Sequence, residues 1–179
     1  AERAGPVGGM AELSEWARST RRWVGLPPDA GSWGVPAERE GDFVASFREG
    51  FEAAEARKLG PALMVLQQMQ KDYPRAPGTL ALACGVYPLA GMWTDARRVC
   101  RESVRAWDEV IPGQVGCGLI AARMGAWDEA QEHFERAIGL DPSKEALWKA
   151  ARDAYRKGGR LKWLEDLKRR YQERFLRPL

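Results

Sequence analysis

Apolar and small residues in the second half of the chain recur at three- and four-residue steps, which predicts amphipathic helices. After Gly125, one face of such a helix carries Ala130, Phe134, Ala137 and Ile138. The pair Asp141-Pro142 then ends this helix, because proline disfavours a helical residue before it and opens the next helix well. The segment is therefore one predicted helix with a defined turn on each side.

The same pattern occurs once more, earlier in the chain. Gly91-Met92-Trp93-Thr94-Asp95-Ala96 matches Gly125-Ala126-Trp127-Asp128-Glu129-Ala130 in one register, so that residue 91 and residue 125 mark one period. Each glycine lies between two apolar helical runs, where a tight turn without a Cβ is needed. A fixed period of this length indicates stacked helical hairpins.

On these residues the chain resembles the tetratricopeptide repeat (TPR) family. The resemblance implies an all-α superhelix of stacked helical hairpins, with an N-terminal extension and a C-terminal capping helix. It also implies a scaffold or adaptor that binds other proteins. The identity of the partner does not follow from it.

The chain divides, by this interpretation, into an extension over residues 1–36 and a TPR-like domain over residues 37–179. The extension would hold a mobile start at 1–9, an amphipathic helix at 10–24, and a Gly/Pro-rich loop at 25–36 that contains Trp33. The domain would hold a divergent repeat at 37–76, repeats at 77–110 and 111–144, and a final hairpin and cap at 145–179. We expect the extension to cap the first repeat, although it could also fill the groove or contact a partner.

Three details depart from a regular repeat. The first hairpin, with a helix over about 37–58 and a turn at Gly60-Pro61, would have a shortened first helix or turn. Pro88 lies inside a predicted first helix, which should either end early or bend there. The last helix, after Gly158-Gly159, lacks the small alanine of a repeat and is interpreted as the closing cap.

Composition supports a folded and soluble protein. Apolar residues make up 45% and charged residues 30% of the chain. No apolar run approaches the roughly 20 residues needed to span a bilayer. The start of the chain lacks the layout of a signal peptide, although one removed earlier would leave no trace.

The three cysteines, Cys84, Cys100 and Cys117, are odd in number and widely spaced. This spacing is typical of neither a disulfide framework nor a zinc site. We therefore expect three buried thiols and, from them, a reducing cytoplasmic location.

The sequence offers little for catalysis. The single histidine, His133, lies one step off the apolar stripe of its helix and should be half-exposed. No phosphate-cradling glycine loop is present, and the carboxylates alternate with basic residues on helix surfaces. We predict no catalytic residue, cofactor or metal ligand.

A basic C-terminal segment leaves nucleic-acid binding as a less favoured alternative. Net charge is +3, and the last 25 residues contain nine Lys or Arg against three acidic residues. The polar outer face of a terminal repeat explains most of this bias. Aromatic rings that stack on bases must be exposed, whereas Tyr171 and Phe175 belong to an apolar stripe and should be buried; only Trp163 lies off it.

The favoured function is recognition of a polypeptide. In TPR proteins the first helices of successive repeats line a concave groove, which implies groove positions at Ala81, Leu82, Gly85, Leu89, Val115, Gly116, Leu119, Ala122, Arg123, Lys149, Asp153, Arg156 and Lys157. The Lys–Asn set with which some members hold a C-terminal carboxylate is missing. The predicted partner-binding residues are Leu89, Leu119, Arg123, Lys149, Asp153 and Arg156.

Such a groove, apolar in its first half and basic in its last, suits a helical or extended partner segment with an acidic end. The alternative for Leu89 and Leu119 is packing against neighbouring helices. A further alternative is self-assembly, with the N-terminal segment of one chain docked in the groove of another to give a homo-oligomer.

Overall fold

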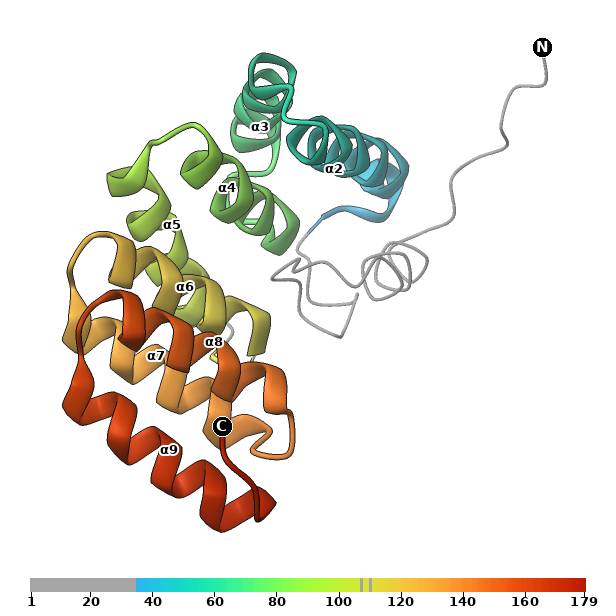
Figure 1. Cartoon of the computed structure of the whole chain (residues 1–179). Coiled ribbons are helices and arrows are strands. Elements are labelled where there is room, and N and C mark those ends of the chain that lie inside the picture. The colour runs from blue at the N-terminus through green and yellow to red at the C-terminus, as the bar shows by residue number, and fades with distance from the viewer. Residues whose placement is uncertain (1–34, 107, 110) are drawn as a thin grey trace. The chain divides into compact units, whose positions relative to one another are not determined.

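A computed structural model describes residues 35–106, 108–109 and 111–179 of the chain. The predicted mobile start, the predicted helix over 10–24 and Trp33 lie outside the described residues. Where the chain is described, it forms eight α-helices and one short 3-10 helix, with no strand (Figure 1). The all-α prediction is therefore confirmed. The chain divides into two compact units, Ala1–Gly113 and Gln114–Leu179.

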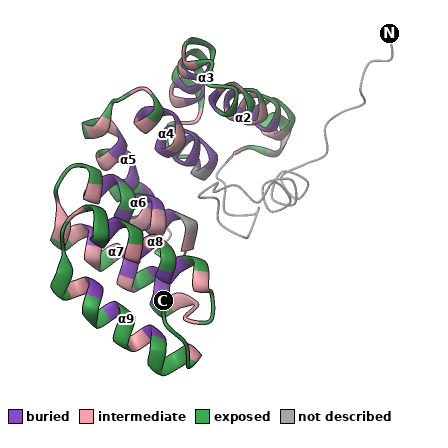
Figure 2. Cartoon of the chain, viewed as in Figure 1, coloured by how far each residue is buried: buried purple, intermediate pink, exposed green. Residues whose placement is uncertain are grey.

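The first unit consists of helical hairpins. Its elements are η2 (Ala37–Arg39), α2 (Glu40–Glu55), α3 (Leu59–Asp72), α4 (Pro77–Leu89) and α5 (Trp93–Ala106). Helix α2 packs against α3 and α4, α3 packs against α4, and α4 packs against α5. Exposed and buried positions alternate along α2, α3 and α5, as amphipathic sequences require, whereas α4 is buried along most of its length (Figure 2).

The second unit has the same construction. Helix α6 (Ile111–Arg123) begins just before the division and is followed by α7 (Trp127–Leu140), α8 (Glu145–Lys157) and α9 (Leu161–Phe175). Helix α7 packs against α8, and α8 packs against α9. Helices α6 and α7 approach closely, since a Cβ added at Gly118 would lie 3.0 Å from the ring of Phe134.

The helix boundaries repeat with the period found in the sequence. Helices α4, α6 and α8 begin at residues 77, 111 and 145 and end at residues 89, 123 and 157. The beginnings of α3, α5, α7 and α9 are separated by the same interval, so that Trp93 and Trp127 are each the first residue of a second helix. Both indoles are half-buried. The regular spacing extends over four hairpins, including the first one.

The turn inside each hairpin repeats as well. Four residues with positive φ, Arg57, Gly91, Gly125 and Gly159, follow one another at intervals of one period. Each is followed by a backbone N–H that reaches back five residues, for example from Met92 to the Tyr87 carbonyl at 2.9 Å and from Ala126 to the Ala121 carbonyl at 2.9 Å. This pattern is a Schellman motif, which satisfies the last carbonyls of the first helix.

Small residues permit the helices of a hairpin to pack tightly. Ala62, Ala96 and Ala130 occupy one repeat position and are fully buried. The equivalent residue of α9 is Leu164, which confirms that the small alanine is lost in the last helix. The core of the second unit also contains an edge-to-face pair, Phe134 and Tyr155, with ring centroids 5.8 Å apart.

The prediction of a shortened first hairpin is wrong. Helix α2 has 16 residues and is longer than any other first helix, and it ends in register with them at Glu55. The turn is formed around Arg57, whereas Gly60 and Pro61 lie in the first turn of α3. Proline is tolerated there, because the N–H groups of a first turn have no partner within the helix.

Pro88 does not end its helix early. Helix α4 continues to Leu89 and has the same length as α6 and α8. The proline lies in the last turn, where its carbonyl accepts a hydrogen bond of 3.1 Å from Gly91 N–H. The Schellman motif is therefore built with a proline inside the helix.

The prediction of three thiols is correct for one cysteine only. Cys84 is a free, buried thiol, and burial raises its pKa to about 12. Cys100 and Cys117 are disulfide-bonded, which corrects the expectation for these two residues. The inference of a reducing location rested on the thiols and loses that support.

Candidate functional site

Three of the predicted partner-binding residues lie on one exposed stripe of α8. Lys149, Asp153 and Arg156 follow each other at steps of four and three residues, so they share a face of the helix. All three are exposed. The opposite face carries the buried residues Trp148 and Tyr155, and this burial fixes the orientation of α8.

The charges on this stripe are partly balanced within α8. Lys149 Nζ lies 3.5 Å from a carboxylate oxygen of Glu145. Arg152 donates a hydrogen bond of 2.8 Å to Asp153, and this bond lowers the pKa of the Asp153 carboxyl. Arg156 makes no ion pair with any described residue. After the Arg152 hydrogen bond, the charge of Arg156 also lowers the pKa of the Asp153 carboxyl, so the positive charge near the C-terminal end of the stripe is partly balanced.

Leu119 and Arg123 form a second exposed stripe, on α6. Leu119 keeps 48% of its surface exposed, which is high for a leucine in a packed hairpin. The buried side of α6 is held by Gly118 against Phe134 and by Gln114, whose side-chain oxygen lies 2.8 Å from Nδ1 of His133. Together these contacts leave Leu119 on the solvent side of α6.

The remaining predicted residue, Leu89, belongs to the first unit and is 39% exposed. Leu89 and Leu119 are each partly covered and partly exposed, so their role in binding a partner stays a prediction. The wider set of groove positions needs correction, however, because Ala81, Leu82 and Gly116 are buried. Leu82 packs on α2, where its Cδ2 lies 2.7 Å from a Cβ position built at Gly50.

The aromatic residues of the basic C-terminal segment are engaged in the fold. Tyr171 is 2% exposed, as predicted, and its hydroxyl donates a hydrogen bond of 2.9 Å to Glu145. Trp163 and Phe175 are half-buried and make edge-to-face contacts with Tyr155 and Trp148. Tyr171 therefore has no free face on which a base could stack.

The side chain of His133 contacts two neighbouring side chains, Gln114 and Glu129. Its side chain is 15% exposed, which is less than the half-exposed position predicted, with Gln114 Oε1 2.8 Å from Nδ1 and Glu129 Oε1 4.0 Å from Nε2. Within residues 35–106, 108–109 and 111–179, no three His, Cys, Asp or Glu side chains could hold a metal ion. The absence of catalysis remains a prediction.

Sequence reasoning missed a cavity between α7 and α9, which is lined by Trp148, Arg174 and Phe175 among others. Phe175 was assigned to an apolar stripe, and the stripe does not reveal that this ring is only partly covered. The sequence did contain a signal for this cavity, because an arginine and an aromatic residue, Arg174 and Phe175, are adjacent at the end of α9.

None of the helices in the described part of the chain has the length and apolar character needed to cross a membrane. Comparison with protein families and with curated proteins adds no relative: no family model matches the chain, and no curated protein matches it.

Proposed function

We propose that this protein is a non-catalytic scaffold of the TPR type, which binds a segment of a partner polypeptide along the exposed faces of its first helices. The observation that carries the proposal is the regular repeat period. It sets the helix boundaries of four hairpins and places a Schellman motif at residues 57, 91, 125 and 159. Helical repeats with this period are scaffolds whose first helices form an extended binding surface.

The exposed residues support a partner of defined chemistry. Leu119 offers apolar contact on α6, and the α8 stripe ends in the exposed cation Arg156. An apolar residue gives affinity, whereas a charge at one end orients the bound segment. The partner segment is therefore amphipathic, helical or extended, with an acidic end.

The two alternative functions gain no further support. Self-assembly through residues 1–36 involves a segment of which the structure describes only residues 35 and 36. Nucleic-acid binding would need exposed aromatic rings, and Tyr171 is buried. Both stay predictions of lower rank.

The test uses a partner captured from lysate by the full chain and identified by mass spectrometry. The purified partner segment is then titrated against wild type, Leu119→Glu, Arg123→Glu and the control Met64→Glu. Met64 is a matched control because it is 72% exposed and lies on α3, a second helix. The circular dichroism spectrum of every variant should match that of wild type, which checks that the helical fold is intact.

We expect Leu119→Glu to abolish binding because it removes an apolar contact, and Arg123→Glu to do so because it reverses a positive charge. Met64→Glu should bind as wild type does. Equal binding by wild type and Leu119→Glu would contradict the groove assignment.

A further inference from the structure

A cavity of about 730 Å³ opens in the second unit, between the C-terminal halves of α7 and α9. The turn between α7 and α8 closes one side of it. The cavity shares no lining residue with the α6 and α8 stripes, so an occupant would be separate from the partner proposed above. Its volume lies within the range of about 300–1,000 Å³ that small-ligand sites occupy.

One wall of the cavity is apolar and already ordered. It is formed by Ile138, Trp148 and Phe175. The two aromatic rings are in edge-to-face contact, with centroids 6.2 Å apart. The indole N–H of Trp148 donates a hydrogen bond of 3.0 Å to the Pro142 carbonyl, which fixes the orientation of the ring. Ile138 and Trp148 are each only 4% exposed, so an aromatic or branched apolar group would contact mainly the half-buried Phe175 ring, with Trp148 behind it.

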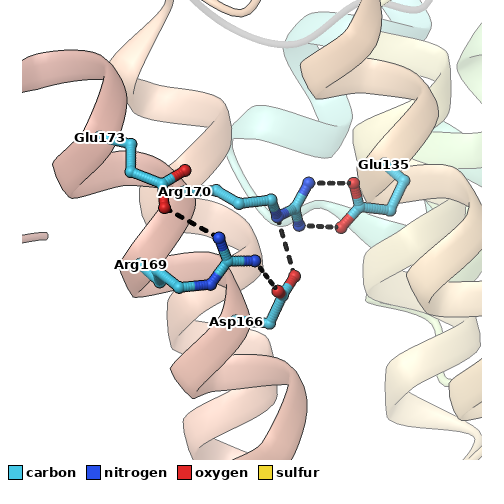
Figure 3. A network of polar contacts seen from close by, with 5 residues as sticks. All are labelled: Glu135, Asp166, Arg169, Arg170 and Glu173. Carbon is cyan, nitrogen blue, oxygen red and sulfur yellow. Dashed lines mark hydrogen bonds and ion pairs between the residues drawn. The ribbon is translucent and has the colours of Figure 1, made fainter.

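The two carboxylates that line the cavity are already paired. Figure 3 shows Arg170 donating two hydrogen bonds to Glu135, at 2.6 and 2.9 Å. It also shows Arg169 donating to Glu173, at 2.8 Å. Asp166 lies 2.8 Å from Arg170 and 2.7 Å from Arg169, so it links the two pairs into one network. The negative charges of the lining are thus compensated within the protein.

Arg174 is the cation that this network leaves out. It lines the cavity and is exposed, and its guanidinium carbon lies 6.0 Å from the centroid of the Phe175 ring. No carboxylate of the described residues pairs with it. An uncompensated positive charge therefore stands beside the aromatic wall, and this arrangement selects a ligand with an apolar body and an anionic group.

We propose that this cavity binds an aromatic or branched apolar group that carries a carboxylate. Arg174 pairs with the carboxylate, and Trp148 and Phe175 pack against the apolar group. The same chemistry is found in the C-terminal residue of a polypeptide and in a free aromatic acid. The experiment below separates these two sources.

The test is an NMR titration of the ¹⁵N-labelled full chain, followed at the assigned indole N–H of Trp148. The ligands are N-acetyl-phenylalanine, its amide, and a pentapeptide that ends in phenylalanine with either a free or an amidated C-terminus. We expect both free acids to shift the Trp148 signal and both amides to bind at least about tenfold more weakly, as for loss of a charge-assisted hydrogen bond. Tighter binding of the peptide acid assigns the site to polypeptide C-termini, and equal or weaker binding assigns it to free acids.

Two variants test the role of the arginine. Arg174→Gln should weaken binding of the free acids by about tenfold. Lys168→Gln is the matched control, because Lys168 is an exposed cation of α9 that does not line the cavity, and it should bind as wild type does. The proposal is overturned if neither acid shifts the Trp148 signal, if the amides bind equally well, or if both variants lose the same affinity.

Discussion

At the scale of single residues, two tyrosines occupy one repeat position in different surroundings. Tyr87 and Tyr155 are separated by two repeat periods, and both rings are buried. The Tyr87 hydroxyl lies 2.8 Å from Nε2 of Gln70, which donates a hydrogen bond to it. The Tyr155 hydroxyl is buried and has no hydrogen-bond partner among the described residues, and burial raises its pKa. The two repeats therefore share a buried tyrosine ring, whereas only the Tyr87 hydroxyl has a hydrogen-bond partner.

Replacement of each tyrosine by phenylalanine should therefore have different effects. We expect Tyr87→Phe to lower the free energy of unfolding by about 1 kcal/mol, because it removes a hydrogen bond and leaves Gln70 without this partner. Tyr155→Phe should leave that free energy unchanged or raise it by up to about 1 kcal/mol, because it removes an unsatisfied buried group. Urea unfolding of both variants measures the difference. Equal destabilisation by the two changes would show that this description of Tyr155 is wrong.

Glu145 connects the beginning of α8 to the end of the chain. It accepts hydrogen bonds from Tyr171 and Arg177, and these bonds, that from Tyr171 first, lower the pKa of its carboxyl below the ordinary value of 4.5. A carboxyl whose pKa is lowered on folding contributes stability above its unfolded pKa, and this contribution is lost as the pH falls through the native pKa.

Glu145→Gln should therefore lower the melting temperature at pH 7, and the difference from wild type should shrink as the pH falls to 3. The control is Glu165→Gln, since Glu165 is an exposed carboxylate on α9. Thermal melts at the two pH values provide the measurement. A difference that does not depend on pH would exclude the carboxylate pairing as the source of the effect.

At the scale of elements, the four hairpin turns differ in one residue. Three of them place glycine in the left-handed region, with φ of 64–75°, whereas the first places Arg57 there with φ of 56°. A non-glycine residue in this region costs about 1–2 kcal/mol. The first hairpin keeps the geometry of the others in spite of this cost.

Arg57→Gly should stabilise the protein by about 0.5–1 kcal/mol, because relief of the left-handed strain exceeds the added entropy of the unfolded chain. The reverse substitution in another repeat, Gly125→Ala, should destabilise it by about 1 kcal/mol for the same reason. Denaturant unfolding of both variants measures whether each substitution raises or lowers the free energy of unfolding. Destabilisation by Arg57→Gly would contradict the equivalence of the four turns.

The elements also show what the sequence could and could not predict. The repeat period predicted the hairpins, because the turn glycines and the small alanines recur at fixed places. It failed at the first turn, since Arg57 carries no glycine signal and the neighbouring Gly60-Pro61 suggested a turn where α3 begins. Some predicted groove positions are exposed and others are buried, for a related reason. Leu119 faces solvent, while Leu82 of the same kind of helix faces a neighbour, and periodicity alone does not separate these faces.

At the scale of the whole molecule, we expect a division of labour between first and second helices. In the proposed function, the exposed stripes on α6 and α8 bind the partner segment, whereas the separate cavity lies between α7 and α9. The oxidation state of the cysteines could not be read from spacing, because a disulfide depends on which helices meet and the sequence does not give that.

The most direct measurement is amide hydrogen exchange of the full chain with and without saturating partner segment. We expect added protection in α6 and α8, around Leu119 and Arg156, and little change in α7 and α9. Protection confined to α7 and α9, with α6 and α8 unchanged, would contradict the claim that the exposed faces of the first helices are the binding surface.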